Sequence, residues 1–119
     1  MPVEKGTDVA DARQPASVDQ LRLATGFADS ERDKIVALFR RLDRRLERFP
    51  ADEVDMELSV KERDQPSQYV VLECWIAKKD RFVATSRERD IRKALVEVRD
   101  DLWRQIDKAV NRRIAQKRR

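Results

Sequence analysis

The stretch from residue 54 to residue 76 leaves the least freedom in how this chain folds. Apolar and polar side chains alternate strictly over residues 54–61, which is typical of a strand with one buried and one exposed face. A turn cluster containing Asp64 and Pro66 separates it from a β-rich run at 69–76. We therefore predict an antiparallel hairpin. Its uniformly apolar face consists of Val54, Met56, Leu58, Val60, Val70, Leu72, Cys74 and Ile76.

Two more strands extend this hairpin. After a short turn at 78–80, residues 81–86 predict a third strand that continues an antiparallel meander. Upstream, the alternation within residues 18–27, closed by Gly26, indicates one further strand. Trp75 falls on the face of the hairpin opposite the apolar one, where we expect it to be partly exposed.

Two amphipathic helices are predicted around the meander. Ser30 followed by Asp33 resembles a capping box, and Pro50 ends the helical pattern that begins there. A second, longer helix starts from Ser86 or Asp90 and meets no glycine or proline before the C-terminus. The apolar stripe of the first helix recurs at three- and four-residue spacing in Ile35, Leu38, Phe39, Leu42, Leu46 and Phe49.

The order β-α-β-β-β-α predicts an α+β fold, in which a four-stranded sheet packs both helices on one face. A chain of 119 residues has room for one core. We expect a flexible N-terminal arm at 1–17, one α+β domain at 18–113 and a basic C-terminal tail at 114–119. We also expect a monomer.

Positive charge is concentrated at the C-terminal end of the chain. Residues 81–119 carry thirteen cationic and six acidic side chains, a net of +7, whereas residues 1–30 and 31–80 carry −2 and −1. A charge run is often only a solvated helix face, but arginines projecting from two helices also suit phosphate, and structured RNA is the predicted partner. The candidate RNA-binding residues are Arg40, Arg44, Arg48, Arg92, Arg99, Arg104, Lys108 and Arg112.

The sequence lacks the residues that most enzyme chemistry requires. It has no histidine, one cysteine and two glycines, so it favours no metal site, no nucleophile paired with histidine and no glycine-rich phosphate loop. Carboxylates such as Asp55 and Glu57 fall on the exposed face of a strand, where solvation explains them better than acid–base catalysis. We therefore expect no catalytic residue, no cofactor and no small-molecule substrate.

The same composition favours a cytoplasmic protein. Cys74 lies within an apolar run, so we expect a buried free thiol, which suits a reducing compartment. No apolar stretch approaches the roughly twenty residues needed to cross a bilayer. The first eight residues lack the charged start and apolar middle of a signal peptide.

Several short segments stand in a specific order between residues 20 and 113. They are Leu58-Ser59-Val60, Ala84-Thr85-Ser86, Glu88-Arg89-Asp90-Ile91, Ala94-Leu95 and Arg104-Gln105-Ile106 with Lys108. In this order they resemble the bacterial ribosome hibernation-promoting factor and ribosome-associated translation inhibitor family, whose single-domain fold is β-α-β-β-β-α. Arg92 stands where that family usually has tyrosine, and Asp101 where lysine is common.

The resemblance implies a ribosome-binding protein of the short form, without the domain that dimerises ribosomes. Such a protein occupies the decoding region of the small ribosomal subunit, with basic helix faces against ribosomal RNA, and inhibits translation by steric exclusion. Arg104 and Lys108 are the best-matched contact candidates. Two alternatives stay open: a general double-stranded RNA-binding module, and a protein-interaction module that uses the sheet face around Trp75.

Overall fold

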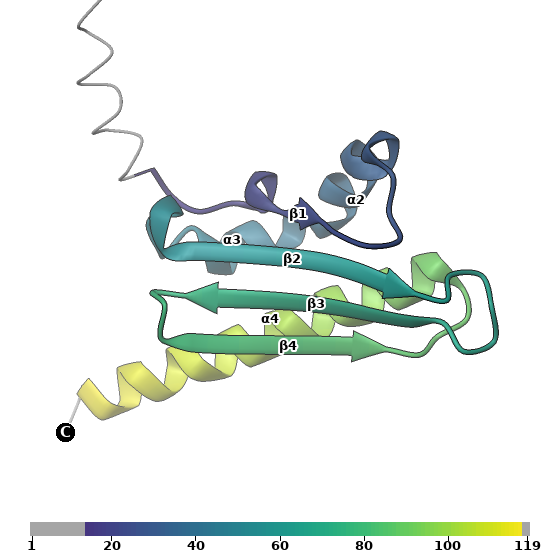
Figure 1. Cartoon of the computed structure of the whole chain (residues 1–119). Helices are drawn as coiled ribbons and strands as arrows, with labels where there is room; N and C mark the ends of the chain where they lie inside the picture. The colour runs from purple at the N-terminus through teal and green to yellow at the C-terminus, as the bar shows by residue number, and fades with distance from the viewer. Residues whose placement is uncertain (1–13, 118–119) are drawn as a thin grey trace, which may run out of the picture.

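The computed structural model describes residues 14–117 and contains one four-stranded mixed sheet in the order β1-β2-β3-β4 (Figure 1). The predicted meander is confirmed: β2 (Val54–Lys61), β3 (Tyr69–Ile76) and β4 (Asp80–Ser86) pair antiparallel in succession. The fourth strand, β1 (Arg22–Leu23), pairs with β2 in parallel. The α+β fold predicted from the sequence is therefore confirmed, although β1 is much shorter than the alternation indicated.

A capped turn explains why β1 is short. Ser17 Oγ accepts a hydrogen bond from the Asp19 N–H at 3.1 Å, and Gln20 Oε1 accepts one from the Ser17 N–H at 3.0 Å. These bonds hold Val18–Gln20 in a 3-10 turn, so this part of the predicted strand is wrong.

The N-terminal boundary of the domain also differs from the prediction. The Ala16 N–H donates to the Phe49 carbonyl at 2.9 Å, the Ala51 N–H donates to the Gln14 carbonyl at 2.7 Å, and Ala16 is buried. Residues 14–17, which we assigned to a flexible arm, thus pair with the segment after the first helix. The rest of the expected arm, residues 1–13, lies outside the described residues.

The first predicted helix forms as a helical segment in four parts. Its N-terminal end is held by Glu31, whose carboxylate accepts from the Ala28 N–H at 2.9 Å, so the predicted capping by Ser30 is wrong. A 3-10 turn interrupts the α-helix near its middle. The four parts are η2 (Asp29–Glu31), α2 (Arg32–Phe39), η3 (Arg40–Leu42) and α3 (Asp43–Leu46).

The long C-terminal helix, α4 (Ile91–Lys117), forms as predicted. Asp90 Oδ1 accepts from the Lys93 N–H at 3.0 Å, which confirms Asp90 as the residue that caps its start. Its 27 residues span about 40 Å. The helix passes the boundary expected at residue 113, and the last two residues of the expected tail lie outside the described residues.

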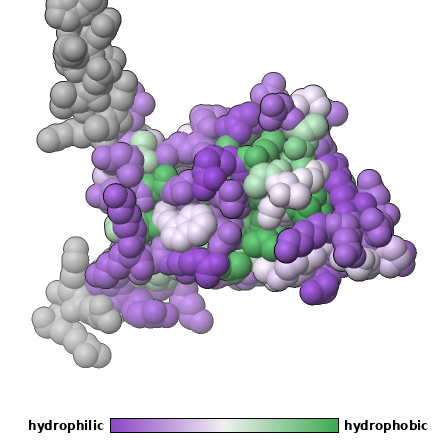
Figure 2. All heavy atoms as spheres, viewed as in Figure 1, coloured by the Kyte–Doolittle hydropathy of each residue, from purple (hydrophilic) through white to green (hydrophobic). Residues whose placement is uncertain are grey.

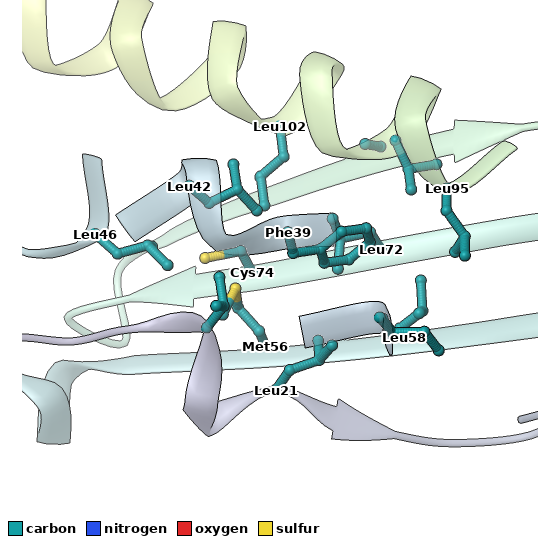
Figure 3. Close-up of a cluster of buried hydrophobic side chains, with 14 of the residues drawn as sticks. Leu21, Phe39, Leu42, Leu46, Met56, Leu58, Leu72, Cys74, Leu95 and Leu102 are labelled. Carbon is teal, nitrogen blue, oxygen red and sulfur yellow. The ribbon is translucent and has the colours of Figure 1, made fainter. Parts of the chain in front are cut away.

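One hydrophobic layer joins the helices to the sheet. Figure 1 places α2, α3 and α4 on the same side of the sheet. Phe39 from α2, Leu102 from α4 and Met56 from β2 are fully buried between them (Figure 3). Cys74 is a buried free thiol as predicted, and burial raises its pKa to about 12, so it stays protonated.

No helix of the described residues lies on the other face of the sheet (Figure 1). Figure 2 shows that hydrophilic residues cover most of this open face and that apolar residues gather in patches between them. Trp75 lies here, partly exposed as predicted, with the Arg81 guanidinium 5.9 Å from the centre of its ring.

Candidate nucleic-acid interface

The first helical segment and α4 lie side by side and run in the same direction. At their N-terminal ends, Leu38 of α2 and Leu95 of α4 line one cleft. At their C-terminal ends, Phe49, just after α3, and Val110 of α4 line one hollow. The two segments together form a helix layer, defined here as residues 32–48 and 91–117.

Trp103 occupies the seam between the two helical segments. The guanidinium groups of Arg41 and Arg45 lie 5.0 and 4.4 Å from the centre of its ring, which is cation–π geometry. Arg45 also pairs with Asp107 at 2.7 Å, and its side chain is only 23% exposed. These two arginines therefore fasten the first helical segment to α4.

Arg99, one of the eight predicted RNA-binding residues, points into the same seam. Its Nη1 donates to the Leu38 carbonyl at 3.1 Å, and its Nε donates to Asp100 at 2.8 Å. The side chain is 16% exposed. Arg99 thus holds α4 against α2 and presents little of its charge to a partner outside the protein.

Arg40 is exposed, but its charge is matched within the protein. It pairs with Asp19 at 3.0 Å and with Asp43 at 3.1 Å. The hydrogen bond that Arg40 donates to the Asp19 carboxylate is the main cause that raises the pKa of Arg40, and the same bond lowers the pKa of Asp19. A phosphate would have to compete with two carboxylates for this guanidinium.

The other six predicted residues present their charge to solvent. Arg104 is 69% exposed, and its one ion pair among residues 14–117 is with Asp101, at 3.6 Å. The remaining five are exposed and have no ion-pair partner within residues 14–117. They are Arg44, Arg48, Arg92, Lys108 and Arg112.

These six cations are spread along the helix layer instead of forming one cluster. Arg92 lines the cleft at the N-terminal ends of the helices, and Arg48 lines the hollow at the C-terminal ends. Arg104 faces the β4 side, where it lines a hollow with Thr85. An elongated polyanion could contact such a distribution, whereas a single small anion could contact only part of it.

Two cations with the same properties were missed among the candidates. Lys34 and Lys93 are exposed and have no ion-pair partner within the described part of the chain. Lys34 precedes the apolar stripe residue Ile35, and Lys93 follows the predicted contact Arg92. Helical periodicity places both outside the apolar stripe, so it could have found both.

The helix layer carries a net charge opposite to that of the rest of the chain. Residues 32–48 and 91–117 hold fifteen cationic and seven acidic side chains, a net of +8, whereas the remaining residues hold twelve and sixteen, a net of −4. On the open face of the sheet, Arg22 pairs with Asp55 and Glu57, both at 2.9 Å, and Arg81 pairs with Glu73. Uncompensated positive charge therefore gathers on one side of the molecule.

No protein-family model matches the chain, and no curated protein matches it. Within residues 14–117 no helix has the length and apolar character needed to span a membrane. The same residues contain no group of three or more cysteine or acidic side chains that could hold a metal ion.

Proposed function

We propose that this protein binds the small ribosomal subunit through its helix layer and holds the ribosome idle by occupying the decoding region. The observation that carries the proposal is the net charge of +8 on the helix layer against −4 on the rest of the chain. Six of the predicted RNA-binding residues of this layer are exposed and available to phosphate, and arginine, which makes up most of them, presents a fixed fork of donors to it.

The choice of the ribosome as the RNA-containing partner rests on the sequence resemblance. The β-α-β-β-β-α order and the Arg104 and Lys108 positions both support the ribosome-binding domain of the hibernation-factor family. The proposed action is steric, since a bound domain in the decoding region would exclude messenger and transfer RNA. It requires no catalytic group, cofactor or small-molecule substrate.

The test is co-sedimentation of the purified protein with vacant bacterial ribosomes at near-physiological salt, in the presence of excess generic RNA duplex. We expect the protein to pellet stoichiometrically despite the duplex and to inhibit translation in a cell-free assay. If the duplex competes the protein away from the ribosomes, the protein is instead a general double-stranded RNA-binding module. Failure to pellet in any condition would overturn the proposal.

Two charge-matched variants locate the surface. Arg104→Glu with Lys108→Glu reverses two cations of the helix layer and should abolish pelleting. Lys61→Glu with Lys79→Glu reverses two exposed cations of the sheet and its turn, changes the net charge by the same amount, and should pellet normally. Trp75→Ala is compared with the Arg104→Glu, Lys108→Glu double variant. If Trp75→Ala abolishes pelleting and the double variant still pellets, the sheet face is the interface and RNA is not the partner.

A further inference from the structure

A cleft of about 310 Å³ opens between the first turns of α2 and α4. Its floor is apolar and comes from both helices. Ile35 and Leu95 are buried beneath it, while Leu38 and Ile91 are partly exposed to it. The floor therefore offers a hydrophobic surface that the fold itself leaves partly open.

The rim of this cleft is cationic. Lys34 and Arg92 line it, both are exposed, and neither has an ion-pair partner among the described residues. Glu31 and Arg63 also line the cleft, but they pair with each other at 2.6 Å, so they add no net charge. The rim thus presents two positive charges above an apolar floor.

This combination fits a ligand with an apolar ring and an attached anion. The volume lies at the low end of small-ligand sites, which suits one base and sugar better than a larger molecule. A nucleotide has both parts, because its base buries a flat apolar face and its phosphate needs cations. Arg92, one of the exposed cations proposed to contact RNA, lines the cleft itself, so the cleft belongs to the proposed RNA surface.

We infer that the cleft receives one unstacked nucleotide of the bound RNA, with its base on the apolar floor and its phosphate between Lys34 and Arg92. This inference rests on the proposed RNA-binding function. The four floor residues offer no side-chain donor or acceptor to the edge of a base, so the cleft should accept any base with little preference.

The experiment compares two hairpin RNAs that are identical except at one bulged position, which carries either a nucleotide or an abasic sugar. Fluorescence anisotropy gives the Kd of the full-length protein for each. Wild-type protein should bind the intact bulge about fivefold more tightly than the abasic one, the low end of what burying one base contributes. A free mononucleotide tests whether the cleft also accepts the ligand without an RNA chain, and we expect it to bind far more weakly than the bulged RNA.

Ser30→Trp should fill the cleft without changing the charge of the protein, since Ser30 is exposed and lines the rim. In this variant the preference for the intact bulge should disappear, while the Kd for the abasic RNA stays at the wild-type value. Gln65→Trp places the same side chain on the exposed β2–β3 loop and should keep the fivefold preference.

The outcomes separate the two proposals. If wild-type protein binds both RNAs equally well, the cleft takes no nucleotide and this inference fails, although the RNA-binding function stands. If it binds neither RNA nor ribosomes, the proposed function itself fails. Unchanged binding of the abasic RNA by Ser30→Trp shows that the variant is folded, and a retained preference in that folded variant would also overturn the inference.

Discussion

At the scale of single residues, Gly26 is held by a close approach of two backbones. It has φ +93°, and a β-carbon there would lie 2.3 Å from Val60 Cγ1 and 2.4 Å from the Val60 carbonyl oxygen. Gly26→Ala should therefore lower the free energy of unfolding by about 3 kcal/mol, through overpacking and left-handed strain together. Urea unfolding measures the change. Thr25→Ala, at an exposed neighbouring position, should change stability by less than about 0.5 kcal/mol.

Glu31 predicts a dependence of stability on acid pH. Its hydrogen bond from Arg63, at 2.6 Å, lowers the pKa of Glu31 to about 2. Because this pKa is below the value of about 4.5 in the unfolded chain, the contribution to stability is complete above pH 4.5 and is lost as the pH falls toward 2. Glu31→Gln should cost about 1 kcal/mol at pH 7, after solvent screening, and much less near pH 2.5. An equal cost at both pH values, measured by urea unfolding, would contradict this account.

Residue-level prediction reached its limit where one helix meets another. The spacing of apolar residues correctly placed Arg104 and Lys108 outside the core of α4. It also placed Arg99 outside, yet Arg99 faces α2 and bonds to the Leu38 carbonyl. Helical periodicity reports which side of a helix meets the sheet, but it carries no information about which flank meets a neighbouring helix.

At the scale of elements, the turn between β3 and β4 offers a gain in stability. Ala77 and Lys78 both have positive φ, at 56° and 54°, and the Lys79 N–H donates to the Ile76 carbonyl, as in a type I′ turn. Neither residue favours that conformation. Ala77→Asn with Lys78→Gly supplies the preferred pair and should raise the free energy of unfolding by about 1 kcal/mol.

Thermal and urea unfolding would measure this gain. As a check of additivity, the same double change is made in a chain that already carries Gly26→Ala. The two turns lie far apart in the sheet, so their effects should add. If the turn variant is less stable than the parent chain, side-chain contacts of Ala77 or Lys78 outweigh the backbone preference.

Elements with one strong period were predictable, and elements set by local caps were not. The alternation of β2 and β3 survived intact because each buries one face along its whole length. By contrast, Ser17 and Gln20 turn residues 18–20 away from the expected strand. The 3-10 turn at Arg40–Leu42 was also missed, because apolar spacing of three and four residues suits both α- and 3-10 geometry.

Side chains from the helix layer bond to a few backbone carbonyls at or next to the two edge strands. On the β1 side, the Arg32 guanidinium donates to the carbonyls of Asp19 and Leu21, both at 2.6 Å. On the β4 side, Gln105 Nε2 donates to the Val83 carbonyl at 2.8 Å. Open strand edges invite pairing with other chains, so these bonds oppose association through the sheet. The side of the helix layer that faces the sheet thus bonds to it, and the opposite side presents the exposed cations to solvent.

At the scale of the whole molecule, the separation of charge governs how the protein should respond to salt. Six of the predicted RNA-binding residues of the helix layer are exposed and have either no ion-pair partner in the described region or only the 3.6 Å pair of Arg104. If each contacts one phosphate, binding releases about six counterions. By analogy with duplexes, the Kd for ribosomes should then weaken about a thousandfold between about 50 and 200 mM monovalent salt.

The slope of log Kd against log salt concentration tests which residues take part. Removing two phosphate contacts with Arg104→Gln and Lys108→Gln should lower the magnitude of that slope by about two, whereas Lys61→Gln and Lys79→Gln should leave it unchanged. Glutamine is used here because a reversed charge would add repulsion to the loss of contact. A complex whose affinity does not depend on salt would rule out phosphate contacts as its main source of energy. A slope that changes equally in both variants would mean that only the net charge of the protein matters, and not the helix layer on which that charge lies.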